Sequence, residues 1–287
     1  MGTPQVPDVE RWKEAVRQDW THRAPAWRRQ NPQFAVQSRA ATETIVQAAR
    51  LKPGMKVLDL ASGAGDPALT LAEMVGPDGH VTATDLVPEM LATAEEYARR
   101  RGLTNMSFQQ ADAEALPFPD QVFDVVTCRL GVMFFPNVQQ ALRGIRRVLK
   151  PGGRAAFVAL GPLAQNPQNR IPQEILSKYV QMPPPEPGAP NPRKFAQAGT
   201  LSAALREAGL QQVQEEYRTI PWPWPGSVEQ LWENEQELRP AIRRLVERLA
   251  PEQREQVDAE VIESFRQYYD GQQVNFTALI VVASGVR

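Results

Sequence analysis

The stretch "VLDLASGAGDPALTLA", residues 57–72, decides the fold that the sequence predicts. An apolar run is followed by a glycine-rich turn and a helix-like pattern, as in the first strand and helix of a nucleotide-binding α/β unit. Gly63 permits a tight turn, Gly65 lets a ligand approach the backbone, and Ala68 permits close packing of helix on strand. Asp59 lies inside the strand just before the turn. A carboxylate there raises the question of which cofactor the loop binds.

Strand-like and helix-like segments alternate from residue 55 to residue 160. Five strands are expected, at residues 55–61, 80–86, 106–112, 123–132 and 154–160. This alternation predicts a parallel sheet with helices on both faces. Ligands of such sheets bind beyond the carboxyl ends of the strands. The sequence places four charged residues at those ends: Asp59, Asp85, Asp112 and Arg129.

Helix boundaries in this region can be assigned to single residues. Asp66 is expected to cap a helix that has Pro67 in its first turn. Pro88 is expected to open the next helix and Gly102 to end it. Asn137 is expected to cap the helix before the fifth strand.

Helices are also expected before the first strand. Trp12, Val16 and Trp20 recur at a spacing of four and predict an amphipathic helix over residues 8–20. The segment "THRAPAWRRQNP" contains two prolines and is interpreted as a break. A second helix is expected from about residue 34 to residue 50.

The character of the sequence changes after Leu160. A proline-rich stretch covers residues 161–194, and its "MPPPEPGAPNP" segment is expected to be an extended connector. Pro240 should kink or split the helical pattern that follows, and Ser227 with Gln230 forms a capping-box pattern. The remaining expected elements are a helix at 200–210, a strand at 211–222, helices at about 227–248 and 252–270, and an apolar last strand from 275. The inserted helices would form a cap over the strand ends.

Composition narrows the class of protein. The 287 residues are 42% hydrophobic and 23% charged, the balance of a globular protein. The net charge of −1 argues against a nucleic-acid partner. A single cysteine, Cys128, excludes a disulfide framework and argues against a cysteine-rich zinc site, so no metal is expected. No signal peptide or membrane span is evident, so a cytoplasmic location is expected. The oligomeric state stays open.

The charges around the loop indicate the cofactor. Asp85 lies 22 residues after the first glycine of the loop, where a carboxylate can accept hydrogen bonds from ribose hydroxyls. NAD and S-adenosylmethionine (SAM) both carry that ribose, but only NAD carries a pyrophosphate. Asp59 and Asp66 would repel a pyrophosphate and favour an ammonium or sulfonium group. Residues 55–79 contain one basic residue, Lys56, so the electrostatics favour SAM.

Four motifs carry a resemblance to a known family: "VLDLASGAGDPALTLA", "VTATDLVPEML", "FQQADAEALPFPDQVFDVVTCRLGVMFF" and "RRVLKPGG". In this order and spacing they resemble class I SAM-dependent methyltransferases, and most closely the ubiquinone/menaquinone biosynthesis C-methyltransferases and their small-molecule relatives. Ala61 stands where the family usually has glycine and should slightly reduce the room for the cofactor. The resemblance covers about residues 50–160 well and the last strand loosely. It implies a doubly wound, Rossmann-like, mostly parallel seven-stranded α/β sheet with an antiparallel last strand and a helical cap.

Four parts of the chain are expected on this basis. They are an N-terminal helical lid (1–50), a SAM-binding core (51–160), a substrate cap (161–274) that includes a core helix–strand unit (200–222), and a final core strand (275–287).

The resemblance also implies a set of cofactor-binding residues after the first four strands: Asp59, Ala61, Gly63, Gly65, Asp85, Leu86, Met90, Asp112, Ala113 and Arg129. The loop that ends at Gly65 would flank the methionine part of SAM, and Asp85 would hold the ribose. Leu86 and Met90 would touch the adenine, and Asp112, with Ala113 beside it, would contact the adenine amino group. Arg129 would lie near the methionine carboxylate or the substrate. "CRLG" follows the fourth strand where enzymes that methylate amides or adenine have an N/D-P-P-F/Y motif, which disfavours those reactions.

Some of these residues have a structural interpretation as well. Asp59 could hold backbone amides, and Arg129 could form a surface ion pair. His22 lies in the segment that, by the resemblance, folds over the cofactor, and it is a candidate for a catalytic base. The six tryptophans either attach the terminal helices to the sheet or form an aromatic cover over a flat substrate, and "PWPWPG" suits a cavity wall.

The function expected from these features is methyl transfer from SAM to an O, C or N atom of a small, largely apolar or aromatic acceptor, with S-adenosylhomocysteine (SAH) as the second product. A protein that binds SAM without methyl transfer is the main alternative. An NAD-linked oxidoreductase is disfavoured by the carboxylates at the loop and by the lack of an evident catalytic Tyr/Lys or His/Asp set.

Overall fold

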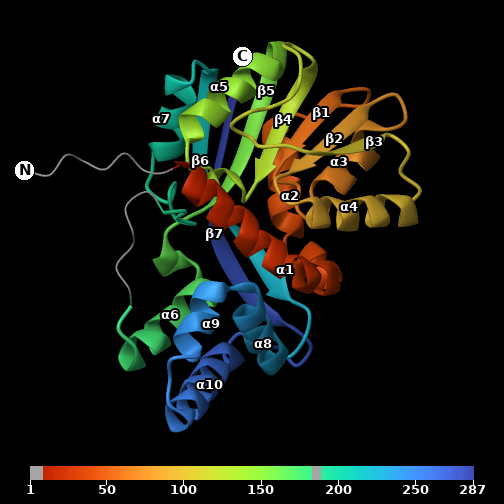
Figure 1. Cartoon of the computed structure of the whole chain (residues 1–287). Helices are drawn as coiled ribbons and strands as arrows, with labels where there is room; N and C mark the ends of the chain where they lie inside the picture. The colour runs from red at the N-terminus through yellow and green to blue at the C-terminus, as the bar shows by residue number, and fades with distance from the viewer. Residues whose placement is uncertain (1–8, 183–188) are drawn as a thin grey trace, which may run out of the picture.

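The computed structural model describes residues 9–182 and 189–287, which form a seven-stranded sheet and a helical cap (Figure 1). The strand order is β3-β2-β1-β4-β5-β7-β6. The strands are β1 (Lys56–Leu60), β2 (His80–Asp85), β3 (Met106–Gln110), β4 (Phe123–Arg129), β5 (Leu149–Leu160), β6 (Gln211–Trp224) and β7 (Val274–Val286). β1 to β5 are parallel, and β7 is antiparallel to both β5 and β6. The doubly wound α/β fold expected from the sequence is confirmed.

Helices cover both faces of the sheet because successive strand residues point to opposite sides. In β1, Val57 packs with α2 (Arg39–Ala49) and α3 (Ala68–Val75) on one face. Leu58 packs with α5 (Val138–Val148) and α7 (Thr200–Glu207) on the other. Both residues are fully buried. The continuous apolar strands of the sequence are therefore the core of a two-faced sheet.

Several predicted helix boundaries are confirmed. α4 (Pro88–Arg100) has its proline in the first turn, and Gly102 follows it with a φ of +70°. Asn137 caps α5 by accepting a hydrogen bond from the amide of Gln140.

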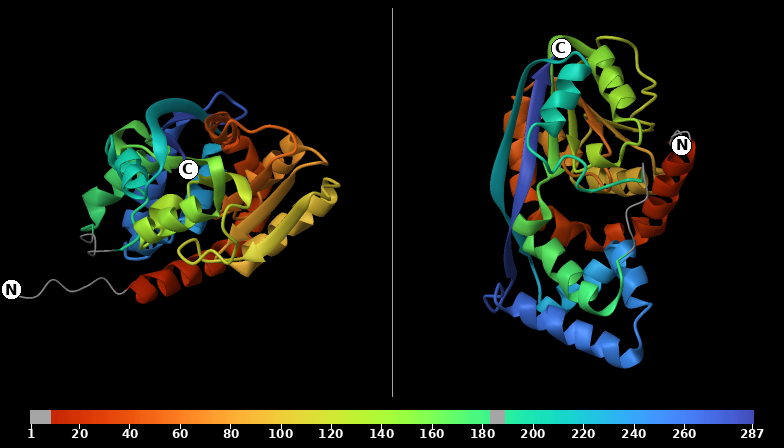
Figure 2. Two further views of the ribbon diagram at one scale, coloured as in Figure 1. Left: turned by 90° about the horizontal axis from the view of Figure 1, so that it is seen from above. Right: turned by 90° about the vertical axis from the view of Figure 1, so that its left-hand side faces the viewer.

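The cap is built from α6 (Pro167–Tyr179), α8 (Val228–Leu238), α9 (Pro240–Val246) and α10 (Pro251–Arg266). It packs around the far ends of the long strands β6 and β7, below the rest of the sheet in Figure 2. Pro240 separates α8 from α9, and Ser227 and Gln230 form the expected capping box. α6 was not predicted, because its sequence contains Pro172 within a proline-rich stretch. Residues 183–188 of the predicted connector at 182–192 lie outside the described residues.

The N-terminal region is one long helix, α1 (Val9–Gln37), and the predicted break at residues 21–32 is wrong. Pro25 and Pro32 lie inside the helix, where each removes a backbone hydrogen bond and costs about 3 kcal/mol in an isolated helix. Tertiary contacts offset this cost: Ala24 and Ala26 are buried, and α1 contacts α4, α8 and β6. Figure 1 shows α1 crossing the front of the sheet above the cap.

Across the part of the chain that the structure describes, no helix is long and apolar enough to cross a membrane. The same residues contain no cluster of three or more metal-ligating side chains.

Candidate active site

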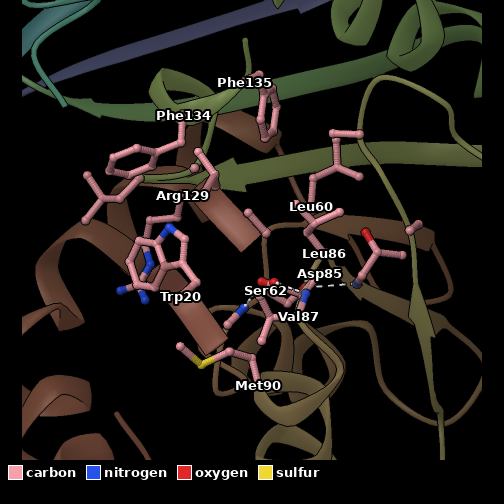
Figure 3. A pocket seen from close by; sticks show the side chains of 18 of the residues that line it. Trp20, Leu60, Ser62, Asp85, Leu86, Val87, Met90, Arg129, Phe134 and Phe135 are labelled. Atoms are coloured by element: carbon pink, nitrogen blue, oxygen red, sulfur yellow. Dashed lines mark hydrogen bonds between the residues drawn. The ribbon is translucent and has the colours of Figure 1, made fainter. Parts of the chain in front are cut away.

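A cavity of about 1170 Å³, including its open mouth, lies at the carboxyl ends of β1, β2 and β4 beneath α1. Figure 3 shows Asp85, Leu86 and Met90 on one side and Trp20 and Phe134 on the other. The sequence prediction of a site at the strand ends therefore agrees with the position of the cavity.

The glycine loop after β1 forms one wall. Ala61 lines the cavity with a φ of +52°, a backbone conformation that favours glycine. A Cβ on Gly131 would lie 2.6 Å from the Cβ of Ala61, so the missing side chain of Gly131 makes room for that methyl group. Gly65 does not line the cavity. A Cβ there would lie 2.8 Å from Leu69 Cδ1 and 3.2 Å from Ala94 Cα, so Gly65 permits close packing of α3 and α4.

Asp85 joins the end of β2 to this loop. One carboxylate oxygen accepts the Gly63 amide at 2.9 Å, and the other accepts the Val87 amide at 3.0 Å. Burial raises the pKa of Asp85, while these amide hydrogen bonds lower it. Each oxygen keeps a further lone pair, so the carboxylate is oriented and can still accept hydrogen bonds from a diol. Leu86, Met90 and Asp85 line the cavity together.

The third strand end contains a charge cluster that the sequence did not predict. Asp112 accepts the Glu114 amide at 2.8 Å, and Asp112 and Ala113 both line the cavity. Lys13 of α1 reaches both acids, with its Nζ 2.8 Å from Asp112 and 2.9 Å from Glu114. Hydrogen bonds and charges from these carboxylates outweigh desolvation and raise the pKa of Lys13. This ion-pair group ties α1 to the loop after β3.

Asp59 lies behind the loop and does not line the cavity. Its side chain is fully buried and accepts a hydrogen bond from Thr127 Oγ1 at 2.5 Å. Burial raises its pKa to about 7, partly opposed by hydrogen bonds from Thr127 and Ser62 and by the charge of Arg129. The carboxylate thus lies next to β4, behind the loop that lines the cavity.

Arg129 and Asp66 form a buried ion pair at 2.9 Å, with Arg129 also donating to the backbone carbonyl of Asp66 at 2.7 Å. The predicted helix cap at Asp66 is wrong, because Pro67 occupies the cap position and Asp66 faces Arg129, Ser38 and Thr42 instead. Arg129 also donates to Thr42 at 3.2 Å and lines the cavity. One interpretation of the sequence placed Arg129 in a surface ion pair, but this ion pair is buried. It joins α2, β4 and the glycine loop.

The positions of the two aspartates correct part of the argument for the cofactor. The charge of Asp66 is balanced by Arg129, and Asp59 is set back from the cavity. Neither carboxylate therefore offers a free charge to a ligand at the loop. The preference for SAM over NAD cannot rest on these two residues.

Aromatic side chains form the wall opposite Asp85. Trp20 lies 5.8 Å from Phe134 and 5.8 Å from Trp27, measured between ring centroids. Phe34 packs edge-on against Trp27 at 4.3 Å, and Phe135 also lines the cavity. Trp20 and Trp27 line the cavity, where the predicted aromatic cover would lie, and Trp12 does not. The sequence prediction missed Phe134 and Phe135, although they follow the fourth strand directly.

The other tryptophans and His22 lie elsewhere. Trp222, Trp224 and Trp232 are buried in the core shared with the cap, so "PWPWPG" is not a wall of this cavity. His22 is exposed on α1, does not line the cavity, and lies 3.3 Å from a nitrogen of Arg243.

The fold and the cavity together define a class of protein: a Rossmann-like domain with an oriented carboxylate at the end of β2, apolar side chains after it, and an aromatic chamber closed by an N-terminal helix. These groups fit a nucleoside that carries a positive charge among apolar groups. Asp85 has acceptors for a ribose, and the aromatic faces attract a cation. Comparison with known proteins places the chain within that class.

The profile of the ubiE/COQ5 methyltransferase family matches residues 36–183. A ubiquinone/menaquinone biosynthesis C-methyltransferase UbiE from Shewanella sediminis is 34% identical over 183 residues, which cover 59% of this chain and 71% of that protein. The YcgJ protein from Bacillus subtilis has a similar fold, with a TM-score of 0.53 and 22% identity over 86% of this chain and 97% of that one. The [4+2]-cyclase SpnF also shares the fold, with a TM-score of 0.51 and 20% identity over 85% of this chain and 79% of that one.

The chain belongs to the ubiE/COQ5 methyltransferase family, and it is a SAM-dependent methyltransferase.

Proposed function

We propose that this enzyme transfers the methyl group of SAM to an O, C or N atom of a small, largely apolar or aromatic acceptor that binds beneath α1. The observation that carries the proposal is the aromatic chamber of Trp20, Trp27 and Phe134, which continues directly from the glycine loop within one cavity. The names of the UbiE relatives favour a carbon atom as the acceptor. The family match ends at residue 183, before α8, α9 and α10 of the cap, so the acceptor itself does not follow from the family.

In this proposal the cofactor lies along the carboxyl ends of β1 to β3. Asp85 accepts hydrogen bonds from the ribose hydroxyls, and its two backbone hydrogen bonds hold it in the required orientation. Leu86 and Met90 pack on the adenine, and Asp112 with Ala113 lies at its edge. Ala61 and Gly63 flank the methionine part.

Two further residues from the sequence prediction have a supporting role in this proposal. Gly65 acts through the packing of α3 and α4, and Asp59 acts through β4, as their contacts indicate. Arg129 orders the loop through Asp66 and lines the cavity, which in this proposal puts its charge near the methionine carboxylate.

SAM supplies an electrophilic methyl group on a positively charged sulfur. The protein has to hold the acceptor atom in line with the C–S bond, at about 3–3.5 Å, and to exclude water. Trp20 and Phe134 provide rigid apolar faces for that alignment (Figure 3), and α1 supplies both Trp20 and Trp27 to the chamber. We do not assign His22 as a base, because its side chain is exposed and points to Arg243.

Incubation with methyl-labelled SAM and a panel of quinols, phenols and amines tests this function. We expect label in at least one quinol or phenol, detected by mass spectrometry, and label lower by about tenfold or more with the Asp85→Asn variant when the SAM concentration is below the wild-type dissociation constant. SAH binding by the wild-type chain without methyl transfer to any compound in a broad panel would favour the alternative of a SAM-binding protein without this activity.

A further inference from the structure

Five arginines gather where α1 meets the cap. Arg23 comes from α1, Arg193 from the segment before α7, and Arg239, Arg243 and Arg244 from the α8–α9 junction. We call this set the arginine cluster. Burial, followed by repulsion from Arg239, Arg244 and Arg243, lowers the pKa of Arg23 to about 10. Burial and the charge of Arg239 likewise lower the pKa of Arg193 to about 10. The contact of Arg243 with His22, the neighbour of Arg23 on α1, at 3.3 Å places the α8–α9 junction against this part of α1.

Carboxylates balance only part of this charge. Asp19 pairs with Arg23, Glu235 with Arg239 at 2.7 Å, and Glu247 with Arg243 at 3.6 Å. The cluster therefore has five positive charges and three paired carboxylates.

The remaining donors lack anionic partners. Within residues 9–182 and 189–287, neither Arg193 nor Arg244 has a carboxylate partner, and Arg193 donates to the carbonyl of Gly161 at 2.7 Å. Arg23 Nε is buried with no hydrogen-bond partner in the same residues. Arg244 is exposed to solvent, but Arg23 and Arg193 are partly buried, where like charges are costly unless an anion pairs with them. An excess of guanidinium donors at one place is typical of a site for a carboxylate or a phosphate.

The arginine cluster borders the aromatic end of the cavity. The guanidinium of Arg23 lies 4.4 Å from the ring centre of Trp20, and Trp20 lines the cavity. Lys194, next to Arg193, donates to the backbone carbonyl of Phe135 at 2.9 Å, and Phe135 lines the cavity as well. None of the five arginines lines the cavity itself, and Arg23 borders it through Trp20, so a molecule in the chamber reaches the cluster where it extends past Trp20.

We infer that the arginine cluster binds an oxyanion, a carboxylate or a phosphate, carried by the acceptor, while the apolar part of the acceptor lies in the aromatic chamber. This inference rests on the proposed function, because it assigns the aromatic chamber to the acceptor. Arginine forks bind such oxyanions with two parallel hydrogen bonds and so fix orientation as well as position. The anchor determines which atom of the acceptor faces the methyl group.

A matched series of three probes tests the inference: 2-naphthoate, 2-naphthyl phosphate and the neutral 2-naphthamide. Calorimetry with the full chain saturated with SAH measures the dissociation constant of each. We expect at least one anion to bind about tenfold or more tightly than the amide, since a hydrogen bond to a charged group is worth about that factor. Tighter binding of the naphthoate identifies a carboxylate site, and tighter binding of the phosphate identifies a phosphate site.

Two variants locate the effect. Arg23→Met and Arg193→Met keep much of the side-chain volume and should remove the preference for the anion while leaving SAH affinity unchanged. Arg193→Lys keeps the charge and should retain part of the preference, which separates loss of charge from loss of folding. Arg248→Met is the matched control, because it removes an exposed arginine of the cap that does not contribute to the low pKa of Arg23.

Equal affinity for all three probes, absence of binding by either anion, or a preference that persists in Arg23→Met and Arg193→Met would contradict the inference. The probes are also titrated without SAH. A chain that binds naphthoate through Arg23 and Arg193 but does not bind SAH would support the anion site and contradict the proposed function, so the two failures are distinguishable.

Discussion

The carboxyl group of Asp59 is buried behind the glycine loop, so its protonation state changes near neutral pH. Its pKa rises from 3.8 to about 7, mainly through desolvation, and its second oxygen has no hydrogen-bond partner among the described residues. The folded chain therefore holds a proton on Asp59 that the unfolded chain releases between these two pH values. Since the folded state binds more protons there, its stability falls as the pH rises from about 4 through 7.

Asp59→Asn should remove this loss. The free energy of unfolding of the variant, relative to wild type, should increase between pH 5 and pH 8, with an upper limit of about 3 kcal/mol, because only the two pH units between 5 and the folded pKa of about 7 contribute. Urea denaturation at the two pH values measures it. Asp78→Asn, at an exposed turn, is the control for removing a carboxylate. A difference between Asp59→Asn and wild type that is the same at both pH values would show that Asp59 does not titrate in this range.

Single residues also show where sequence reasoning reached its limit. Asp85 could be predicted, because its position at the end of a strand and its spacing from the loop are both local features. The partner of Asp66 could not, because Arg129 meets it only through the pairing of β1 with β4. A carboxylate just before a helix normally indicates a cap, but the carboxylate of Asp66 pairs with Arg129 instead.

At the level of elements, α1 is the feature that gives the cavity its cover. It contacts the glycine loop through Asn31, which donates to the carbonyl of Ala64 at 3.3 Å, and the loop after β3 through Lys13. The side chain of Glu114 is only 1% exposed, so its charge depends on Lys13 for compensation. These contacts hold the helix across the site.

Lys13→Met should loosen α1. A buried carboxylate that loses its cation is destabilising, so we expect faster amide exchange in the N-terminal half of α1 and an increase of about tenfold in the rate of SAH dissociation, typical of one charged hydrogen bond. Hydrogen exchange and stopped-flow displacement measure the two effects. Arg17→Met, which breaks an exposed pair with Glu14 on the same helix, is the control. Identical exchange and dissociation in Lys13→Met and Arg17→Met would exclude Lys13 as the residue that holds the helix closed.

Prediction of elements from sequence depended on whether the deciding contacts were local. The capping residues Asn137 and Ser227 act within one turn and were assigned correctly. The path of α1 through Pro25 was not, because its helical state depends on packing against α4, α8 and β6. α6 was missed for the same reason, since Pro172 opposes a helix locally.

Considered as a whole, the molecule consists of a sheet domain and a cap joined by β6 and β7, with α1 between them at the cavity (Figure 2). The sheet domain could be predicted from sequence, because alternating strands and helices and the residues at strand ends follow from local patterns. The arginine cluster could not, because its members come from α1, the segment before α7 and the cap. Its charges become neighbours only when the cap closes on α1.

The central claim is that the cavity beside Asp85 holds SAM. Calorimetric titration of SAH into the wild-type chain and into Asp85→Asn tests this most directly. Asn keeps one acceptor oxygen but replaces the other with a donor that opposes a backbone amide, so we predict intact folding by circular dichroism and an affinity lower by about tenfold or more. Equal SAH affinity in the folded variant and the wild type would contradict the assignment of Asp85 to the ribose and the placement of the cofactor in this cavity.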